Sequence, residues 1–225
     1  MNITLYIIIL VVCCYLIFDR IQDRKLLKTV TDTNRGTKSE RKLVVKLLKL
    51  GIPAETIFHD LYVRKYRDNY SQIDLVVVTE VGILVFEVKD YSGWIYGNDS
   101  AKWTQVLAYG RQKNRFYNPT MQNTKHIIEL KKQLGQFENI PFYSIIVFYG
   151  NCVLKEFGTV PYGTSIIKHR LISQLMKEIL TNAEPTLYKN KADIIEILKD
   201  AASNGANKEV RTRHVENIRN MFERN

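Results

Sequence analysis

The chain has 225 residues, of which 45% are hydrophobic, and its formal net charge is +10. A chain of this size can bury a core without disulfides or metals. Its three cysteines, two of them adjacent in an apolar leader and one alone, exclude a disulfide framework and a zinc-type spacing, and they indicate a reducing compartment. The positive charge favours an anionic partner, either nucleic acid or an acidic membrane surface.

The chain begins with an apolar segment, NITLYIIILVVCCYLIF, over residues 2–18. As a helix it would be about 25 Å long, just enough to cross a hydrocarbon core of ~30 Å with some thinning. Arg20, Arg24, Lys25 and Lys28 follow it and no basic residue precedes it, so the positive-inside rule places the remaining chain in the cytoplasm. A cleavable signal peptide and a buried core helix are the alternatives, but a signal peptide needs a basic start and a small-residue cleavage site. The sequence therefore predicts a single-pass anchor in the cell membrane.

A polar linker leads to a first predicted helix over residues 38–50, which a Gly-Ile-Pro sequence ends. Its start, from Thr37 to Glu40, fits a capping box, in which both side chains satisfy free backbone N–H groups. Glu40 also lies at the N-terminal end of the apolar stripe of this helix. It is therefore either a capping residue, which the pattern alone favours, or a carboxylate aimed at a site beside the core. A first strand is predicted over residues 57–63.

Residues 71–90, SQIDLVVVTEVGILVFEVKD, are two apolar, β-branched runs that predict a hairpin, yet three charged residues lie inside them. A two-residue turn at positions 80–81 would place Asp74 opposite Glu87. Because side chains alternate along a strand, Lys89 would then lie on the same face. A bulged turn with a left-handed glycine would instead shift the pairing by one residue and remove Asp74 from that face.

Two facing carboxylates repel each other and require a cation or a proton between them. Oxygen ligands without neighbouring His or Cys suit Mg²⁺ or Mn²⁺. Lys89 could hold an attacking water or offset the charge that builds on a phosphate. Metal-assisted phosphodiester hydrolysis needs this set of groups. The alternative is an ion pair between Asp74 and Lys89, with Glu87 facing solvent at the end of its strand.

The elements after the hairpin are predicted from turn residues, caps and periodicity. Asn118 and Pro119 form a helix start, with asparagine as the cap and proline in the first turn. The predicted elements are a strand pair within 90–106, a helix over 118–134, a buried strand at 141–149, a short strand that includes Thr159, and helices over 165–181, 190–203 and 207–223.

Aromatic and basic residues follow the hairpin and indicate contacts with nucleic acid, since aromatic rings stack on bases and cations hold phosphates. Trp94 is instead predicted to pack against the sheet. The histidines are scattered, which is typical of ordinary surface or core residues. The predicted nucleic-acid contacts are Lys89, Tyr91, Trp103, Arg111, Lys113 and Arg115.

Several of these motifs occur in an order that resembles the nuclease-related domain (NERD), a family grouped with the PD-(D/E)XK nucleases. The matching motifs are SERKLVVKLLK, QIDLVVVTEVGILVFEVKDYSGWIYG, WTQV, FYNPTMQNTKHI and IPFYSIIVF, within residues 36–155. The resemblance implies an α/β fold of the restriction-endonuclease type, in which a central mixed sheet is flanked by helices and the site lies at the edge of a hairpin.

The resemblance also implies roles for individual residues. Asp74 matches the first acidic position of the family, although Ile73 stands where the motif that names the superfamily has proline. Glu87 and Lys89 match its E-x-K. Glu40 matches an acidic residue on the helix before the sheet, and Gln122 matches a polar position near the site. The implied catalytic set is Asp74, Glu87, Lys89, Glu40 and Gln122, with Asp74, Glu87 and Glu40 holding Mg²⁺ or Mn²⁺.

These predictions divide the chain into an anchor (1–18), a juxtamembrane linker (19–36), a nuclease-related domain (37–155) and a helical C-terminal extension (156–225). The helices of the extension would pack on the domain or bind a protein partner. The predicted function is that of a membrane-anchored, metal-dependent nuclease acting on DNA or RNA. The alternative is a non-catalytic module that binds nucleic acid or protein at the cytoplasmic face of the membrane.

Overall fold

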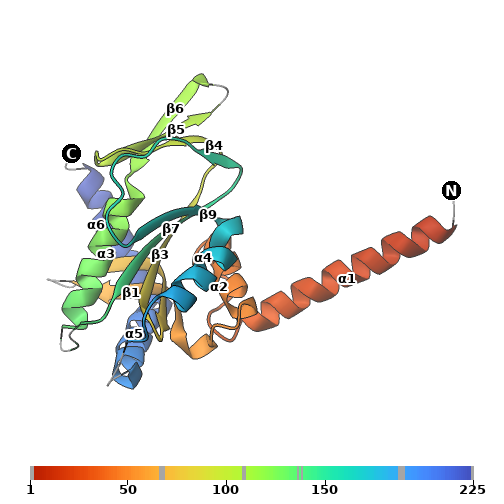
Figure 1. The fold of residues 1–225 in the computed structure, drawn as a ribbon, viewed down its shortest axis with the longest axis horizontal. Helices are drawn as coiled ribbons and strands as arrows, with labels where there is room; N and C mark the ends of the chain where they lie inside the picture. Colours follow the sequence, from red (N-terminus) through yellow and green to blue (C-terminus); the bar gives the residue numbers. More distant parts are fainter. Residues whose placement is uncertain are drawn as a thin grey trace.

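The computed structural model describes residues 3–65, 69–107, 110–135, 137, 139–186 and 191–223. It has two sheets flanked by helices, and one long N-terminal helix projects from this body (Figure 1). The helices are α1 (Ile3–Leu27), α2 (Lys38–Lys49), α3 (Pro119–Gln133), α4 (Ile172–Asn182), α5 (Lys191–Ala206) and α6 (Lys208–Glu223), with short turns η1 (Ala54–Thr56) and η4 (His169–Leu171). The strands are β1 (Ile57–Arg64), β2 (Tyr70–Thr79), β3 (Gly82–Asp90), β4 (Gly93–Tyr96), β5 (Lys102–Leu107), β6 (Gln112–Tyr117), β7 (Phe142–Tyr149), β8 (Cys152–Leu154) and β9 (Thr164–Lys168).

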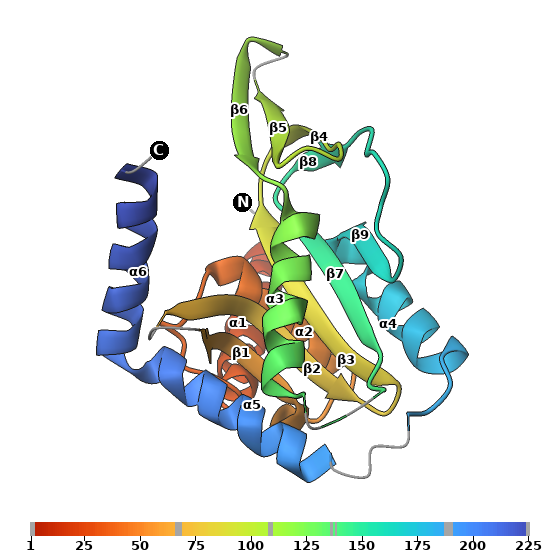
Figure 2. The same ribbon diagram turned by 90° about the vertical axis from the view of Figure 1, so that its left-hand side faces the viewer.

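The large sheet has the strand order β1-β2-β3-β7-β9. Its first three strands are antiparallel, whereas β3, β7 and β9 run parallel, so the sheet is mixed. Helices α2 and α4 pack on one face, and α3 and α5 pack on the other (Figure 2). Because both faces of the sheet are covered by helices, the central strands β2 and β3 are rich in apolar, β-branched residues. The predicted α/β fold, a mixed sheet flanked by helices, is confirmed.

The β2–β3 hairpin has the two-residue turn at positions 80–81. Thr79 pairs with Gly82, and Leu75 pairs with Phe86, without a bulge between them. The Thr79 hydroxyl donates a hydrogen bond of 2.8 Å to the Gly82 carbonyl and so closes the turn. Gly82 has a φ of 144°, and a Cβ there would lie 2.6 Å from the carbonyl oxygen of Pro141. Glycine is required at this position, and the register that the unshifted hairpin predicted is confirmed.

The small sheet has the strand order β6-β5-β4-β8 and stands above one end of the large sheet (Figure 2). Its inner face contributes Ile95 and Trp103 to a cluster with Ile146 and Phe148 of β7. Trp103 is only 2% exposed, because its ring lies between Phe148 and Phe157. The predicted strand pair within 90–106 is therefore present as β4 and β5. Strands β6 and β8 were not predicted.

The two predicted caps are present. The Thr37 hydroxyl accepts a hydrogen bond from the Glu40 N–H at the start of α2, and the Asn118 side chain accepts bonds from Thr120 and Met121 at the start of α3. Each cap satisfies backbone groups that a helix start leaves unpaired. The predicted bounds of both helices agree with the structure to within one residue, as does the strand predicted at 141–149.

The region after residue 155 differs most from the prediction. Residues 164–168, expected as the start of a helix, form β9 and extend the large sheet beside β7. Thr159 lies outside any strand, and α5 continues through the predicted break to Ala206. The physical reason is that the Ser-Ile-Ile run of β9 can complete the open edge of a parallel sheet, a long-range contact that local periodicity does not reveal. Strand β9 and helices α4 and α5 are thus part of the fold itself.

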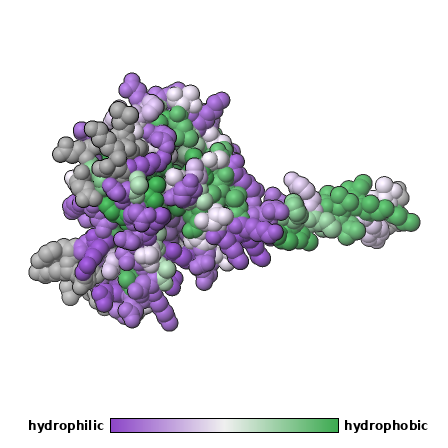
Figure 3. Space-filling view, turned by 90° about the horizontal axis from the view of Figure 1, so that it is seen from below, coloured by the Kyte–Doolittle hydropathy of each residue, from purple (hydrophilic) through white to green (hydrophobic). Residues whose placement is uncertain are grey.

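Helix α1 is one continuous helix from Ile3 to Leu27, so the helix is not interrupted at the predicted boundary between anchor and linker. Its apolar part is exposed and forms the hydrophobic rod seen in Figure 3. By length and composition it is the one helix in the described ranges that could cross a membrane. Its C-terminal end joins the body, where Lys49 contacts Asp23 at 2.5 Å and Leu27 enters the core.

A chain that ends at Lys155 is expected not to fold. It would lose the apolar side chains that α4 and α5 bury on the two faces of the sheet, namely Ile172, Met176, Ile194 and Leu198. Burial of such a side chain contributes about 1.5–3 kcal/mol, so the total loss is comparable with the whole stability of a domain. Thermal unfolding followed by near-ultraviolet circular dichroism, in detergent, should show no cooperative transition. A chain that ends at Ala206, and so lacks α6 but keeps α4 and α5, should unfold cooperatively. A cooperative transition in both chains would contradict the conclusion that α4 and α5 are part of the fold.

Candidate functional site

The candidate site lies where β2 and β3 separate. Their pairing ends at Leu75 and Phe86; beyond these residues β2 continues beside β1, and β3 continues beside β7. The Val88 N–H, which a ladder would pair with β2, donates instead to Asp74 Oδ2 at 2.7 Å. The carboxylate of Asp74 therefore lies between the two strands, against the segment of β3 that carries Glu87 and Lys89.

Lys89 contacts two of the other predicted site residues. Its Nζ lies 2.6 Å from Glu87 Oε1 and donates a hydrogen bond of 3.0 Å to Gln122 Oε1. Burial alone lowers the pKa of Lys89, but the Glu87 and Asp74 carboxylates outweigh it and raise the pKa above the usual value of 10.5. Lys89 is therefore an ammonium at neutral pH and cannot act as a base. The prediction that Gln122 lies near the site agrees with this contact.

Glu87 has a second partner that the sequence did not indicate. It is 1% exposed, and its Oε2 lies 3.4 Å from Nε2 of His126. His126 Nδ1 in turn lies 3.0 Å from the Ser71 hydroxyl. His126 follows Gln122 by four residues on α3, so both point from the same side of the helix. One helix thus supports both members of the Glu-x-Lys pair.

Glu40 combines the two roles that the sequence left open. Its N–H takes part in the cap with Thr37, and its Oε2 lies 3.3 Å from Nε2 of His59, whose Nδ1 lies 3.0 Å from the Thr31 hydroxyl. Burial raises the pKa of Glu40, but its hydrogen bonds with His59 and Thr37 outweigh burial and lower it. Glu40 is therefore ionised at neutral pH, next to a buried imidazole.

Asp74 carries the unfavourable electrostatics of the site. Burial, followed by the charges of Glu87 and Glu40, raises its pKa well above the usual value of 3.8. The Val88 N–H and Lys89 act in the opposite direction but do not compensate. The charges of the other two carboxylates therefore act on Asp74, which keeps its proton to a higher pH than an ordinary aspartate.

The chemistry of this donor set fits a hard divalent cation, because three mutually repelling carboxylates favour such an ion. The described side chains do not form a complete ligand set: no group of three or more His, Cys, Asp and Glu residues within the described ranges is placed to hold a metal. The Lys89 ammonium instead takes up one oxygen of Glu87. An ion that binds Glu87 would therefore compete with Lys89 for that oxygen.

Sequence reasoning missed the polar residues that surround the carboxylates. His59 and His126 were expected to be ordinary histidines, and both are buried, but each faces a site glutamate. Asn123 is fully buried, and its side-chain amide donates to the Val85 carbonyl at 2.8 Å and to the Ser144 hydroxyl at 2.9 Å. The one usable signal was a polar residue on the apolar stripe of α3, which Asn123 occupies.

The residues predicted to contact nucleic acid differ in their placement. Trp103 is buried in the core against Phe148 and Phe157 and has no exposed face for a base, which corrects its assignment. Tyr91 packs against Phe116 at 4.5 Å between ring centres. Trp94, expected to pack on the sheet, is 37% exposed. Three basic residues are exposed at the small sheet rather than within the Asp74 cluster; they are Arg111, Lys113 and Arg115.

Comparisons with known proteins agree with the motifs of the sequence. The family model described as "Nuclease-related domain" matches residues 35–149, which contain all the predicted catalytic residues. An uncharacterised protein of Bacillus anthracis is 32% identical over 189 residues, which cover 82% of this chain and 84% of that protein. No solved structure matches the chain.

The contact between Glu40 and His59 can be tested through Gly36. A Cβ at Gly36 would lie 2.3 Å from Glu40 Oε2 and 2.6 Å from His59 Nε2, whereas a Cβ at Gly51 would meet nothing within 4 Å. Both glycines have positive φ, so Gly51→Ala should measure the backbone effect, roughly 1–2 kcal/mol. Gly36→Ala should lose about 1–3 kcal/mol more, because it separates a buried polar pair. Equal losses in chemical denaturation would contradict this contact.

The raised pKa of Asp74 predicts a pH-dependent gain in stability for Asp74→Asn without divalent ions. The folded chain holds the Asp74 proton to a higher pH than the unfolded chain, so the folded state loses stability as pH rises through the raised pKa. Asparagine retains an oxygen for the Val88 N–H. In EDTA the variant should therefore melt above the wild type at pH 8, by about 2–4 °C per kcal/mol, and this gain should vanish towards pH 4.

The matched control for this measurement is Asp99→Asn, since Asp99 is exposed in the connection between β4 and β5. Its melting temperature should follow that of the wild type at both values of pH. A variant Asp74→Asn that is less stable than the wild type at pH 8 would show that the ionised carboxylate stabilises the fold, contrary to the expectation.

Proposed function

Because the chain belongs to the nuclease-related domain family, we propose that it is a metal-dependent nuclease, anchored in the membrane, that hydrolyses phosphodiester bonds of DNA or RNA. The observation that carries this proposal is the convergence of Asp74, Glu87 and Lys89 at the point where β2 leaves β3. An acidic pair beside a lysine is the set that metal-assisted phosphoryl chemistry requires.

Asp74, Glu87 and Glu40 would supply carboxylate oxygens to Mg²⁺ or Mn²⁺. Such an ion, when bound, lowers the pKa of a water molecule and polarises a phosphate. Ligand carboxylates must be ionised, and the raised pKa of Asp74 favours its protonated form, so binding of the ion should release a proton from Asp74. The activity should accordingly decline at acidic pH.

Lys89 would act as a fixed positive charge. Its raised pKa keeps the ammonium charged, and Gln122 holds it on the side of α3. If Glu87 held an ion, Lys89 would be free to donate to a phosphate oxygen as negative charge develops there. Gln122 would be a positioning residue, because its side chain contacts Lys89.

Helix α1 would anchor this domain in the cell membrane. Its exposed apolar segment is followed by Arg20, Arg24, Lys25 and Lys28, and no basic residue precedes it. This charge asymmetry favours an N-terminus outside the cell and a catalytic domain in the cytoplasm.

A second candidate function is a non-catalytic module that binds nucleic acid or protein at the membrane. One observation favours it: Glu87 already has Lys89 and His126 as partners, and the side chains of the described ranges provide no complete ligand set. In that case the buried charges would stabilise the arrangement of β2, β3 and α3, and the net charge of +10 would attract the partner.

The decisive experiment incubates the purified full chain, in detergent, with plasmid DNA, linear duplex, single-stranded DNA and RNA in Mg²⁺, Mn²⁺ or EDTA. We expect cleavage that requires the divalent ion and that falls at least ~100-fold in Asp74→Ala and in Lys89→Ala. The exposed variants Asp99→Ala and Lys177→Ala should cleave like the wild type. Undiminished cleavage by Asp74→Ala would contradict the proposal that Asp74 is part of a nuclease site.

If no preparation cleaves, binding separates the remaining functions. Affinity for nucleic acid that falls steeply with salt would support a nucleic-acid-binding module, because phosphate contacts release counterions. Association that is insensitive to salt would indicate a protein partner.

A further inference from the structure

The small sheet has an outer face that differs sharply from its inner face. Side chains alternate across a sheet, and in the register of the sheet Trp94 is aligned with Val106, which is aligned with Lys113; Tyr96 is likewise aligned with Thr104 and Arg115. These positions point away from the buried Ile95 and Trp103. The outer face, defined by its aromatic and basic residues, consists of Trp94, Tyr96, Lys102, Lys113, Arg115 and Tyr117.

This outer face has a strongly positive character. None of the four strands β4, β5, β6 and β8 contains an acidic residue, whereas Lys102, Lys113 and Arg115 are all exposed. Lys155, directly after β8, adds a fourth cation, and its Nζ lies 5.2 Å from the centre of the Trp94 ring. The acidic residues close to these strands in sequence are Asp90, which ends β3, and Asp99 and Glu156, which lie in connections. Such a face complements a polyanion.

The exposed aromatic rings indicate which kind of polyanion this outer face would bind. Trp94 and Tyr117 are each 37% exposed, although burial of such rings is strongly favourable. Each ring lies beside an ammonium: Lys155 is over Trp94, and Lys125 lies 4.9 Å from the centre of the Tyr117 ring and donates to its hydroxyl. Rings that alternate with cations can stack on unpaired bases and hold the phosphates between them. In a duplex the bases already stack on one another and offer no such faces.

The outer face is also connected to the candidate site by two short segments. Lys89 and Trp94 are five positions apart on the chain that leads from β3 to β4, at most about 17 Å in extended conformation. Tyr117 precedes the cap of α3, the helix that carries Gln122. A stacked strand rises about 3.4 Å per nucleotide, so the two sites are within a few nucleotides of each other.

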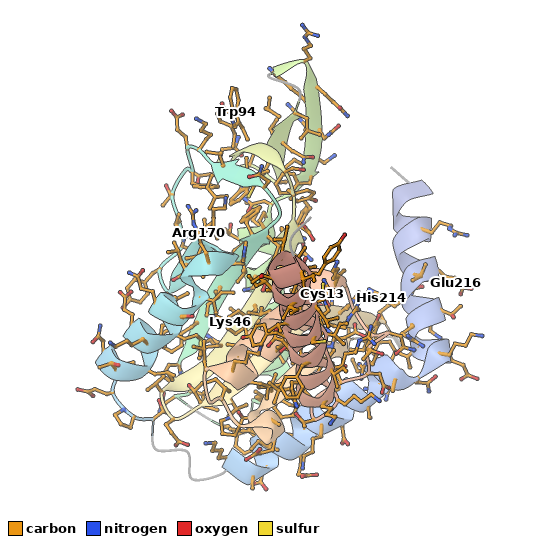
Figure 4. All side chains as sticks on the ribbon, turned by 90° about the vertical axis from the view of Figure 1, so that its right-hand side faces the viewer. Cys13, Lys46, Trp94, Arg170, His214 and Glu216 are labelled. Carbon is orange, nitrogen blue, oxygen red and sulfur yellow. The ribbon has the colours of Figure 1, made fainter. Side chains whose placement is uncertain are left out.

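We propose that the outer face of the small sheet binds single-stranded nucleic acid and leads it to the Asp74 site; this proposal rests on the proposed function. The positive, aromatic surface could in principle contact anionic lipid. However, Figure 4 shows Trp94 at the top of the molecule, well away from Cys13 on the apolar helix α1. Nucleic acid is therefore the occupant that the arrangement favours.

Trp94 offers a direct probe, because the chain has only two tryptophans and the other, Trp103, is buried. The full chain carrying Asp74→Ala, in neutral detergent with EDTA, is titrated with oligo(dT) of about 20 nucleotides, longer than the site of one binding fold. We expect the oligonucleotide to quench Trp94 and to protect it from acrylamide. Trp94→Phe should abolish this signal and leave the Trp103 emission unchanged.

Two further variants locate the contact. Lys113→Glu with Arg115→Glu should weaken oligo(dT) binding by about tenfold or more, and Trp94→Ala with Tyr117→Ala by about tenfold. The control, Arg170→Glu with Lys177→Glu, makes the same change of charge at exposed positions of η4 and α4 and should stay within about twofold of the parent. An equal loss in the control, or duplex bound as tightly as oligo(dT), would overturn the proposal.

The two proposals can fail separately. Binding is measured in EDTA with a variant that cannot cleave, so quenching of Trp94 without any cleavage by the wild type would refute the nuclease and support the binding face. Cleavage by the wild type without protection of Trp94 would refute the binding face alone. Protection of Trp94 by anionic vesicles and not by oligo(dT) would show that the face contacts lipid instead.

Discussion

The hydrogen bond from the Val88 N–H to Asp74 Oδ2 is the contact on which the site depends. A backbone N–H inside a sheet needs an acceptor, and when β2 leaves β3 after Leu75 the ladder no longer provides one. The Asp74 side chain replaces the missing carbonyl and so stabilises the separation of the strands. The same bond fixes a carboxylate beside Glu87. The opening in the sheet and the acidic residue at its centre therefore have one physical cause.

The buried charges around this opening are compensated almost entirely by neighbouring side chains. Glu87 has Lys89 and His126, and Glu40 has His59, so each glutamate faces at least one nitrogen that can carry a proton. Among the described residues, Asp74 accepts a hydrogen bond from the Val88 N–H, and burial together with the charges of Glu87 and Glu40 raises its pKa. Strongly perturbed pKa values of buried carboxylates cluster at functional sites, which is the reason to regard Asp74 as the centre of the candidate site.

The sequence predicted the parts of this site that depend on local rules. Strand alternation and turn length predicted the register of Asp74 and Glu87, with a bulged turn as the alternative, and the apolar stripe placed Glu40 at the edge of the core. The sequence could not predict the contacts of His59 with Glu40 and of His126 with Glu87, because each pair joins two different elements. The burial of Trp94 and Trp103 was also predicted the wrong way round. Which side of a short strand faces the core depends on the strand against which it packs, and here that strand is β7 of the large sheet.

The C-terminal segment bears on the site as well as on the core. The family match ends at residue 149, yet the similarity to the Bacillus anthracis protein is longer, and α5 packs directly on β1. Helix α6 contacts β1, where the His214 ring meets Tyr62 edge-on at 5.4 Å. Helices α4 and α5 supply buried residues to the clusters on opposite faces of the large sheet. The segment beyond the family match therefore covers the sheet that carries the candidate site.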